Sequence, residues 1–334
     1  MITDFHYPKA NIDPELTSGS RHVTNGIAPM HARRYIANRT YDIMHPQKHN
    51  PTNTTEDTTM DLPEKLVIIA GRGAYPRLLA ESAYEQGVKH IAVIAFKGET
   101  DRSIAKIADD VRWVYLGQLK KMLDALQQLA ISNAVMAGQI TPTHLFTVRM
   151  DATLISLLRK LPARNADTIF SAIGDELQEI GVTLLPASCF MEKHMAHTPG
   201  VLTTRPPTPI EERDMEIGLQ VAHTTSSLEI GQTVVVKEGT ILAVEAFEGT
   251  DAAILRAGKL GGPGATLIKI AKRGHDMRFD IPVIGTRTVR SIRKAGISAV
   301  LVEAGRAILL ERNRVLQQLD HMNVTFVVKE PRNV

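Results

Sequence analysis

The feature that most constrains the fold is a regular alternation of short apolar runs with helical patterns, which begins near residue 65. The run Leu66–Ala70 is apolar throughout, as is typical of a strand that is covered on both faces of a parallel sheet. A glycine turn follows it, then a helical pattern over Leu78–Gln86 and a second apolar run at Ile91–Phe96. Strands that alternate with helices form parallel sheets with helices on both faces. We therefore predict an N-terminal, Rossmann-like, doubly wound α/β domain over residues 65–198.

A second α/β domain is predicted over residues 210–334, after a proline-rich stretch at 199–209 that we expect to be a linker. Two strand-like runs, Thr233–Lys237 and Ile241–Ala246, flank a glycine turn and predict an antiparallel hairpin. Apolar runs alternate with helical patterns after the hairpin, so the sheet of this domain should be mixed. Residues 1–64 are polar, contain several prolines and lack periodicity. We expect them to form a disordered N-terminal extension.

Composition narrows the class of function. Aromatic residues make up 4% of the 334 residues, the net charge is +3, and the basic residues are scattered, whereas nucleic-acid-binding proteins gather theirs in stripes. The one cysteine, Cys189, rules out an intrachain disulfide and a thiolate metal cluster, which fits a reducing compartment. No apolar run approaches the roughly 20 residues that span a bilayer, and no secretory signal is visible. We therefore expect a cytoplasmic protein that binds no nucleic acid.

Glycine turns after two of the predicted strands are candidate ligand-binding sites. Gly71 and Gly73 follow the first strand, and Gly138 follows the strand that ends at Ala137. Open α/β sheets bind ligands at the carboxyl ends of their strands, and helix N-termini offer N–H groups to anions. We predict that these three glycines contact the substrate, although tight turns without a ligand fit the pattern equally well. An NAD-dependent oxidoreductase is disfavoured, because Pro76 stands where the dinucleotide fingerprint has its third glycine.

Charged residues gather in the second domain. The stretch Ile268–Gly285 begins as an apolar run and continues as a loop rich in cations and carboxylates, which on charge alone also fits a solvated turn. Carboxylates suit Mg²⁺ or Mn²⁺, which prefer hard oxygen ligands, and lysine and arginine neutralise phosphate oxygens. Cleavage of a phosphorus–oxygen bond needs both, because charge on the transferred group must be stabilised and a water must be oriented. No nucleophile motif such as G-x-S-x-G competes with this interpretation.

From this pattern we assign candidate roles in three groups. The candidate metal ligands are Asp280, Asp251 and Glu248. The candidate catalytic residues are Asp280, Asp251, Lys269 and Lys272. The candidate substrate-binding residues are Gly71, Gly73, Gly138, Gly249, Thr250, Arg278 and Arg306.

Several short motifs also occur in a characteristic order along the chain. They are Ile69–Gly73, Val135–Gly138, Ile230–Gln232, Leu242–Ala246, Glu248–Asp251, Arg278–Gly285 and Val302–Arg306. Each motif is weak alone, but the ordered set is specific. From about residue 65 to the C-terminus, the chain resembles the LpxI-type UDP-2,3-diacylglucosamine pyrophosphatases.

The resemblance implies a fold, a reaction and a site. It implies a Rossmann-like N-terminal domain, a C-terminal domain of the family's own fold, and a site between them. The implied reaction cuts UDP-2,3-diacylglucosamine to UMP and 2,3-diacylglucosamine 1-phosphate in lipid A biosynthesis, with a divalent metal, Mg²⁺ or Mn²⁺. By position, Asp280 is similar to the family's essential aspartate, and Glu248–Asp251 is similar to its E-G-T-D motif. Because this substrate carries acyl chains, we expect transient contact with the cytoplasmic face of the inner membrane, and a homodimer is left open.

Departures from the family pattern keep alternatives open. Arg72 replaces a glycine that is usual in the first turn, and Ala166 stands where the family has an acid. Arg273 replaces a proline, and His275 stands where glutamine is frequent. These departures leave room for a non-catalytic nucleotide-sugar or lipid-binding module of the same fold. An NAD-dependent oxidoreductase is the weaker alternative.

The sequence yields one test, on Asp280. The following Ile281-Pro282 stiffens the backbone and holds the carboxylate in a fixed direction. The Asp280→Asn variant keeps the shape of the side chain and removes its charge. We expect turnover to fall by roughly 10²-fold or more, the scale of losing one transition-state-stabilising group, while the melting temperature changes little. A lower melting temperature with intact turnover per folded molecule would instead identify a structural ion pair.

Overall fold

The computed structural model describes residues 62–140, 148–163, 165–271, 278–279 and 281–331. Nearly all of the predicted N-terminal extension lies outside the described residues, as do the site candidates Lys272 and Asp280. Those assignments stay predictions.

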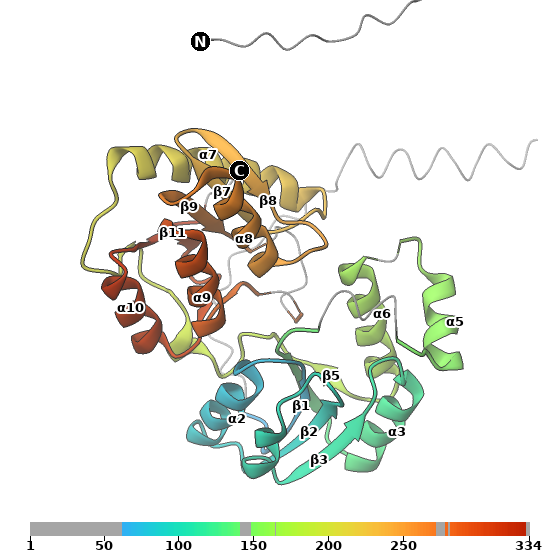
Figure 1. The fold of residues 1–334 in the computed structure, drawn as a ribbon. Helices are drawn as coiled ribbons and strands as arrows, with labels where there is room; N and C mark the ends of the chain where they lie inside the picture. Colours follow the sequence, from blue (N-terminus) through green and yellow to red (C-terminus); the bar gives the residue numbers. More distant parts are fainter. Residues whose placement is uncertain (1–61, 141–147, 164, 272–277, 280, 332–334) are drawn as a thin grey trace, which may run out of the picture. The chain divides into compact units, whose positions relative to one another are not determined.

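Five parallel strands form the sheet of the N-terminal domain, in the order β3-β2-β1-β4-β5 (Figure 1). The strands are β1 (Lys65–Ala70), β2 (His90–Phe96), β3 (Asp110–Val114), β4 (Asn133–Ala137) and β5 (Thr183–Leu184). The chain builds outward from β1 on one side and then returns to add β4 on the other, so the strand order reverses between β1 and β4. This arrangement confirms the predicted Rossmann-like, doubly wound domain.

Helices cover both faces of this sheet. They are α2 (Tyr75–Glu85), α3 (Leu119–Leu129), α5 (Ala152–Lys160) and α6 (Ala166–Glu179). On one face, Leu79 of α2 belongs to the same buried cluster as Leu66 of β1. On the other face, Leu126 of α3 shares a buried cluster with Val67 of β1. Alternate residues of β1 therefore enter opposite cores, which explains why its sequence is apolar throughout.

The sheet of the C-terminal domain is mixed, in the order β6-β13-β11-β9-β7-β8. Its strands are β6 (Gly200–Val201), β7 (Thr233–Lys237), β8 (Thr240–Val244), β9 (Ala265–Lys269), β11 (Ile297–Glu303) and β13 (Thr325–Lys329). The central strands β9, β11 and β13 are parallel, whereas β7 is antiparallel to both β8 and β9. The predicted hairpin and the predicted mixed sheet are both present.

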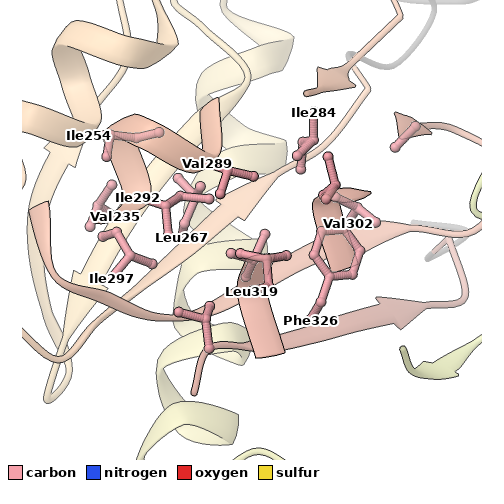
Figure 2. Close-up of a cluster of buried hydrophobic side chains, with 14 of the residues drawn as sticks. Val235, Ile254, Leu267, Ile284, Val289, Ile292, Ile297, Val302, Leu319 and Phe326 are labelled. Atoms are coloured by element: carbon pink, nitrogen blue, oxygen red, sulfur yellow. The ribbon is translucent and has the colours of Figure 1, made fainter. Parts of the chain in front are cut away.

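This sheet too lies between helical layers. One face is covered by α7 (Pro209–Ser227), whose Met215 is buried in the same cluster as Ile268. The other face carries α8 (Thr250–Gly261), α9 (Thr286–Ala295) and α10 (Arg312–His321). Figure 2 shows this second core, in which Ile254 and Ile292 from the helices pack near Leu267 from the sheet.

The strand directions bring several chain segments to one edge of this sheet. Because β8 and β9 are both antiparallel to β7, they run in the same direction, and α8 joins them. The carboxyl ends of β8 and β9, the amino end of β7 and the N-terminus of α8 therefore meet at a single edge. The carboxyl end of β11 lies there as well, since β11 is parallel to β9. In parallel sheets this is the edge that carries ligand sites.

Two short strands, β10 (Val283–Ile284) and β12 (Ile308–Leu309), pair in parallel and form a separate two-stranded sheet. Ile308 forms an antiparallel bridge with Met195. Ile308 and Ile281 are both buried in the cluster that also contains Leu66 of β1. These residues from the second half of the sequence are thus part of the packed core of the N-terminal domain.

The stretch predicted as a linker is bound closely to the C-terminal domain. Its first residues form β6, which pairs with β13 in antiparallel fashion. Arg205 donates to both carboxylate oxygens of Glu211, at 2.8 Å each, and to the carbonyl oxygens of Ser298 and Asn323. Glu211 also closes a capping box with Thr208 at the start of α7. A buried carboxylate with bidentate arginine contacts holds this segment in place.

We predict that the pair of Arg205 and Glu211 makes stability depend on acid. Burial acts to raise the pKa of Glu211, but hydrogen bonds from Arg205 and the Thr208 backbone outweigh it and lower the pKa from 4.5 to about 2. A carboxyl whose pKa is lower in the folded state stabilises the protein above its unfolded pKa, and this contribution is lost as the pH falls from 4.5 toward 2. Glu211→Gln should lower the free energy of unfolding by about 1–2 kcal/mol at pH 7, allowing for solvent screening.

Urea unfolding at pH 7 and at pH 3 measures this contribution. The difference between Glu211→Gln and the unchanged chain should shrink at pH 3. Glu212→Gln is a matched control, because Glu212 is the exposed neighbour on the same helix. Equal losses at the two pH values would contradict the assignment.

Candidate functional site

The centre of the candidate site is Lys269, the last residue of β9. Only 4% of this residue is exposed. Its ammonium donates to the Thr250 hydroxyl at 2.8 Å and lies 3.5 Å from the Thr233 hydroxyl. Thr233 is the residue paired with Lys269 across the two strands, and Thr250 begins α8. The edge described above thus places a buried cation among hydroxyl groups. The sequence named Lys269 and Thr250 as candidate site residues but did not name Thr233.

Lys269 forms no ion pair with any carboxylate that the structure describes. Removing an ammonium from water costs several kcal/mol, so buried charges are normally paired with an opposite charge. Two hydroxyl oxygens provide hydrogen bonds but no countercharge. The arrangement suits an anion that arrives from outside the protein.

The start of α8 adds donors for an anion at the same edge. Gly249 is the N-cap residue, with φ of 82°, and it has no side chain that could accept from the N–H groups of the first turn. A Cβ atom placed on Gly249 would have no neighbour within 4 Å among the described residues. Free N–H groups at a helix N-terminus attract phosphate and carboxylate groups. The predicted roles of Gly249 and Thr250 in substrate binding are consistent with this position.

Glu245 was not among the predicted site residues. It follows β8, is only 8% exposed, and its Oε1 atom accepts a hydrogen bond from the Thr250 hydroxyl at 2.9 Å. Its Oε2 atom is buried and has no hydrogen-bond partner among the described residues. Glu245 does stand at the end of a predicted strand, but the acid Glu248 three residues later belongs to the more conspicuous E-G-T-D motif. The structure therefore adds Glu245, a contact of Thr250, to the residues that the sequence pattern singled out.

The two predicted metal ligands that the structure describes both have partners. Glu248 accepts from Arg256 at 2.6 Å and from the Ala246 backbone N–H at 3.1 Å. Burial acts to raise the pKa of Glu248, but these hydrogen bonds prevail and hold it below its usual range. Asp251 contacts Arg287 at 2.7 Å and accepts from the Ser291 hydroxyl at 3.0 Å. Glu248 thus binds a side chain of α8, whereas Asp251 binds two side chains of α9.

Within the described residues, no three His, Cys, Asp or Glu side chains come together as a metal site would require. Asp280, the third predicted ligand, lies outside those residues. Its neighbours in sequence are well packed: Phe279 stacks on Phe170 of α6, with ring centroids 6.2 Å apart. Ile281 is 6% exposed in the core of the N-terminal domain. The guanidinium of Arg278, a predicted substrate-binding residue, lies 5.1 Å from the Phe279 ring centroid.

The glycines of the N-terminal domain separate into two kinds. Gly71 and Gly138 pack two turns together: a Cβ on Gly71 would lie 2.8 Å from the Gln139 carbonyl oxygen, and one on Gly138 would lie 2.8 Å from that of Arg72. The same turns are joined by an antiparallel bridge between Arg72 and Gln139. Gly73, with φ of 99°, has open space around its Cα. Close packing accounts for Gly71 and Gly138 without a ligand, whereas Gly73 leaves room for one.

Arg306 lies near a second buried group of charges. Its guanidinium is 3.9 Å from Glu303, the last residue of β11, whose side chain is 1% exposed. The His223 imidazole of α7 lies 3.1 Å from the same carboxylate. The sequence predicted Arg306 as a substrate contact, but His223 carried no signal because it is a lone histidine in a helical pattern. Glu303 and His223 lie on the α7 side of the sheet.

The fold and these contacts define a class: a two-domain α/β protein whose second domain holds a buried lysine between two threonine hydroxyls at the carboxyl edge of a mixed sheet. Comparison with protein families gives the same division into two domains. Residues 65–194 match the LpxI N-terminal domain, and residues 198–327 match the LpxI C-terminal domain. The chain belongs to the LpxI family.

Two individual proteins illustrate the comparison. The UDP-2,3-diacylglucosamine pyrophosphatase LpxI of Caulobacter vibrioides is 30% identical over 283 residues, which cover 80% of this chain and 98% of the relative. The biotin carboxylase domain of Hydrogenobacter thermophilus 2-oxoglutarate carboxylase is 12% identical, covering 70% of this chain and 40% of that chain. Its TM-score of 0.25 is too low to support an argument. Among the described helices, none combines the length and apolarity needed to cross a membrane.

The contacts of Asp251 generate a test of its role. Because its two oxygens hold Arg287 and Ser291 of α9, we expect Asp251→Asn and Arg287→Gln each to lower stability by about 0.5–1 kcal/mol, the range of a partly exposed ion pair. The double variant should lose little more than either single variant, since one interaction is removed in all three. Chemical unfolding measures the energies. A turnover loss of roughly 10²-fold in Asp251→Asn that Arg287→Gln does not share would make Asp251 catalytic instead.

Proposed function

We propose that this protein hydrolyses the pyrophosphate bond of UDP-2,3-diacylglucosamine to UMP and 2,3-diacylglucosamine 1-phosphate, a step of lipid A biosynthesis. Membership of the LpxI family supports a hydrolase that acts on a phosphorus anhydride. The relative from Caulobacter vibrioides, which matches over nearly its whole length, is named for this substrate. The reaction requires stabilisation of negative charge on phosphoryl oxygens.

The observation that carries the proposal is the buried ammonium of Lys269. It stands at the carboxyl edge of the sheet, at the N-terminus of α8, without an ion pair among the described residues. A pyrophosphate oxygen bound there would provide a direct ionic partner. In a site that excludes water, a fixed cation stabilises developing charge far more than it would in solution.

Of the other candidate residues, some would bind the phosphoryl groups and one would orient the attacking water. The first-turn N–H groups of α8, with the backbone N–H of Thr250 among them, would orient a phosphoryl group, and Arg278 and Arg306 would neutralise further phosphate oxygens. Asp280 would orient the attacking water, as its similarity to the family's essential aspartate implies. Lys272, three residues after Lys269 in the sequence, would add positive charge.

A divalent ion, Mg²⁺ or Mn²⁺, belongs to the proposal. When bound, such an ion would polarise phosphoryl oxygens and neutralise their charge. The described carboxylates do not form its site by themselves, because Glu248 and Asp251 already hold arginine side chains. The fit therefore depends on Asp280, and we derive no step through the ion.

The proposed substrate also sets the surroundings in which the protein would act. Its acyl chains place it in a bilayer, so the protein would visit the cytoplasmic face of the inner membrane without spanning it. A homodimer is compatible with the proposal, and no part of the proposed chemistry requires one.

Release of UMP from UDP-2,3-diacylglucosamine, with Mg²⁺ or Mn²⁺ and with a chelator, tests the reaction. Lys269→Met keeps the length of the side chain and removes its charge, so kcat should fall by roughly 10²-fold or more. Lys237→Met is the matched control: Lys237 ends β7 at the opposite edge, where its ammonium binds the carbonyl oxygens of Gly261 and Pro263. Its turnover per folded molecule should change less than about twofold. Absence of UMP release from the unchanged protein would refute the proposed reaction.

A further inference from the structure

Three polar side chains around Lys269 form a chain of hydrogen bonds with only one consistent direction. The Thr250 hydroxyl lies 2.9 Å from Glu245 Oε1, 2.8 Å from the Lys269 ammonium and 3.4 Å from the Thr233 hydroxyl. An ammonium group can only donate, and an ionised carboxylate can only accept. The single hydroxyl proton of Thr250 must therefore go to Glu245. Both lone pairs of its oxygen then face Lys269 and Thr233.

By accepting the Thr250 proton, Glu245 thus directs the lone pairs of the Thr250 oxygen toward the Lys269 ammonium. Without an acceptor at the Glu245 position, the Thr250 hydroxyl could rotate and turn its proton toward other acceptors. The ammonium would lose its shortest hydrogen bond, and Thr233, at 3.5 Å, is too distant to replace it well. A lysine side chain without a fixed acceptor has several rotamers available. Glu245 is therefore placed to fix the position of an ammonium that it does not itself pair with.

The burial of Glu245 argues that this position serves function rather than stability. Its Oε2 atom is buried and has no hydrogen-bond partner in the described part of the chain. A buried polar atom without a partner costs about 1–3 kcal/mol. Residues that lower stability are retained where activity needs them. Glu248, three residues later, shows the contrast: both of its oxygens are satisfied by Arg256 and a backbone N–H.

We propose that Glu245 is a positioning residue of the phosphate site, which acts on Lys269 through the Thr250 hydroxyl. The proposal rests on the function proposed above, because it assigns Lys269 to the phosphoryl group. It adds a residue to the site and gives Thr250 an orienting role besides direct contact with the substrate. It also predicts that the effect of Glu245 should depend on a hydroxyl at position 250.

Steady-state kinetics on four variants test this dependence. Glu245→Leu, which removes the acceptor, and Thr250→Val should each lower kcat by roughly tenfold, with KM changed less than about threefold, since Lys269 acts on charge that develops in the transition state. Thr250→Ser keeps the hydroxyl and should stay within about threefold of the unchanged protein. Combining Glu245→Leu with Thr250→Val should add little to either loss, because both break one chain of hydrogen bonds.

Thermal melting separates positioning from a structural role. Glu245→Leu should leave the melting temperature unchanged or raise it, because it removes a buried carboxyl group with an unpartnered oxygen. Glu212→Leu, at an exposed position of α7, is the matched control and should leave kcat unchanged. A lower melting temperature for Glu245→Leu, with kcat per folded molecule unchanged, would overturn the proposal.

A readout without substrate distinguishes failure of this proposal from failure of the proposed reaction. In protein labelled at lysine ¹⁵Nζ, the ammonium of Lys269 should give a resonance that is protected from solvent exchange and that Lys269→Arg removes. Glu245→Leu and Thr250→Val should abolish this protection, whereas Thr250→Ser should keep it. If the unchanged protein releases no UMP, the reaction is wrong but this measurement still decides the role of Glu245. Protection that survives Glu245→Leu overturns the proposal.

Discussion

The structure of the second domain is organised around the need to accommodate one buried ammonium group. Lys269 ends a central strand, and the pleat of that strand directs its side chain into the layer under α8 rather than toward α7. Burying a charge in that position without polar neighbours would strongly destabilise the folded state. The neighbours come from three further elements, because β7, β8 and α8 all present an end at the same edge. Hydroxyl groups satisfy the ammonium without neutralising it.

The antiparallel strand β7 makes this arrangement possible. In a purely parallel sheet, the edge that carries the carboxyl ends holds only strand ends and the loops to the following helices. Here β7 lies between β8 and β9 and begins at that edge, so Thr233 stands beside Lys269. The connection from β8 to β9 then passes over β7 through α8, whose N-terminus faces the same edge. One reversed strand therefore brings an additional hydroxyl into the site.

The two domains use glycine for different purposes at their strand ends. In the N-terminal domain, the reversal of strand order between β1 and β4 marks the place where open sheets often bind ligands. Gly71 and Gly138 fill that place with backbone, since each approaches the other turn too closely for a side chain. In the C-terminal domain, Gly249 has open space beside a helix N-terminus.

The core of the N-terminal domain includes residues from the second half of the sequence. Phe279 stacks on a helix of the N-terminal domain, and Ile281 enters that domain's core. The two sequence neighbours of position 280 are thus held by packing against residues that are remote in sequence.

The sequence by itself determined the elements and the fold class, because these depend on local patterns. Uninterrupted apolar runs identified β1 and β2 of the first domain, a glycine turn identified the hairpin of β7 and β8, and ordered motifs identified the family. It also singled out Lys269, Thr250 and Gly249 at the ends of those elements. Only the tertiary structure separated Glu245 from Glu248, paired Asp251 with Arg287, and brought Thr233 to Lys269. Which acid faces the site depends on strand register and on contacts between residues far apart in sequence, and no local pattern encodes these.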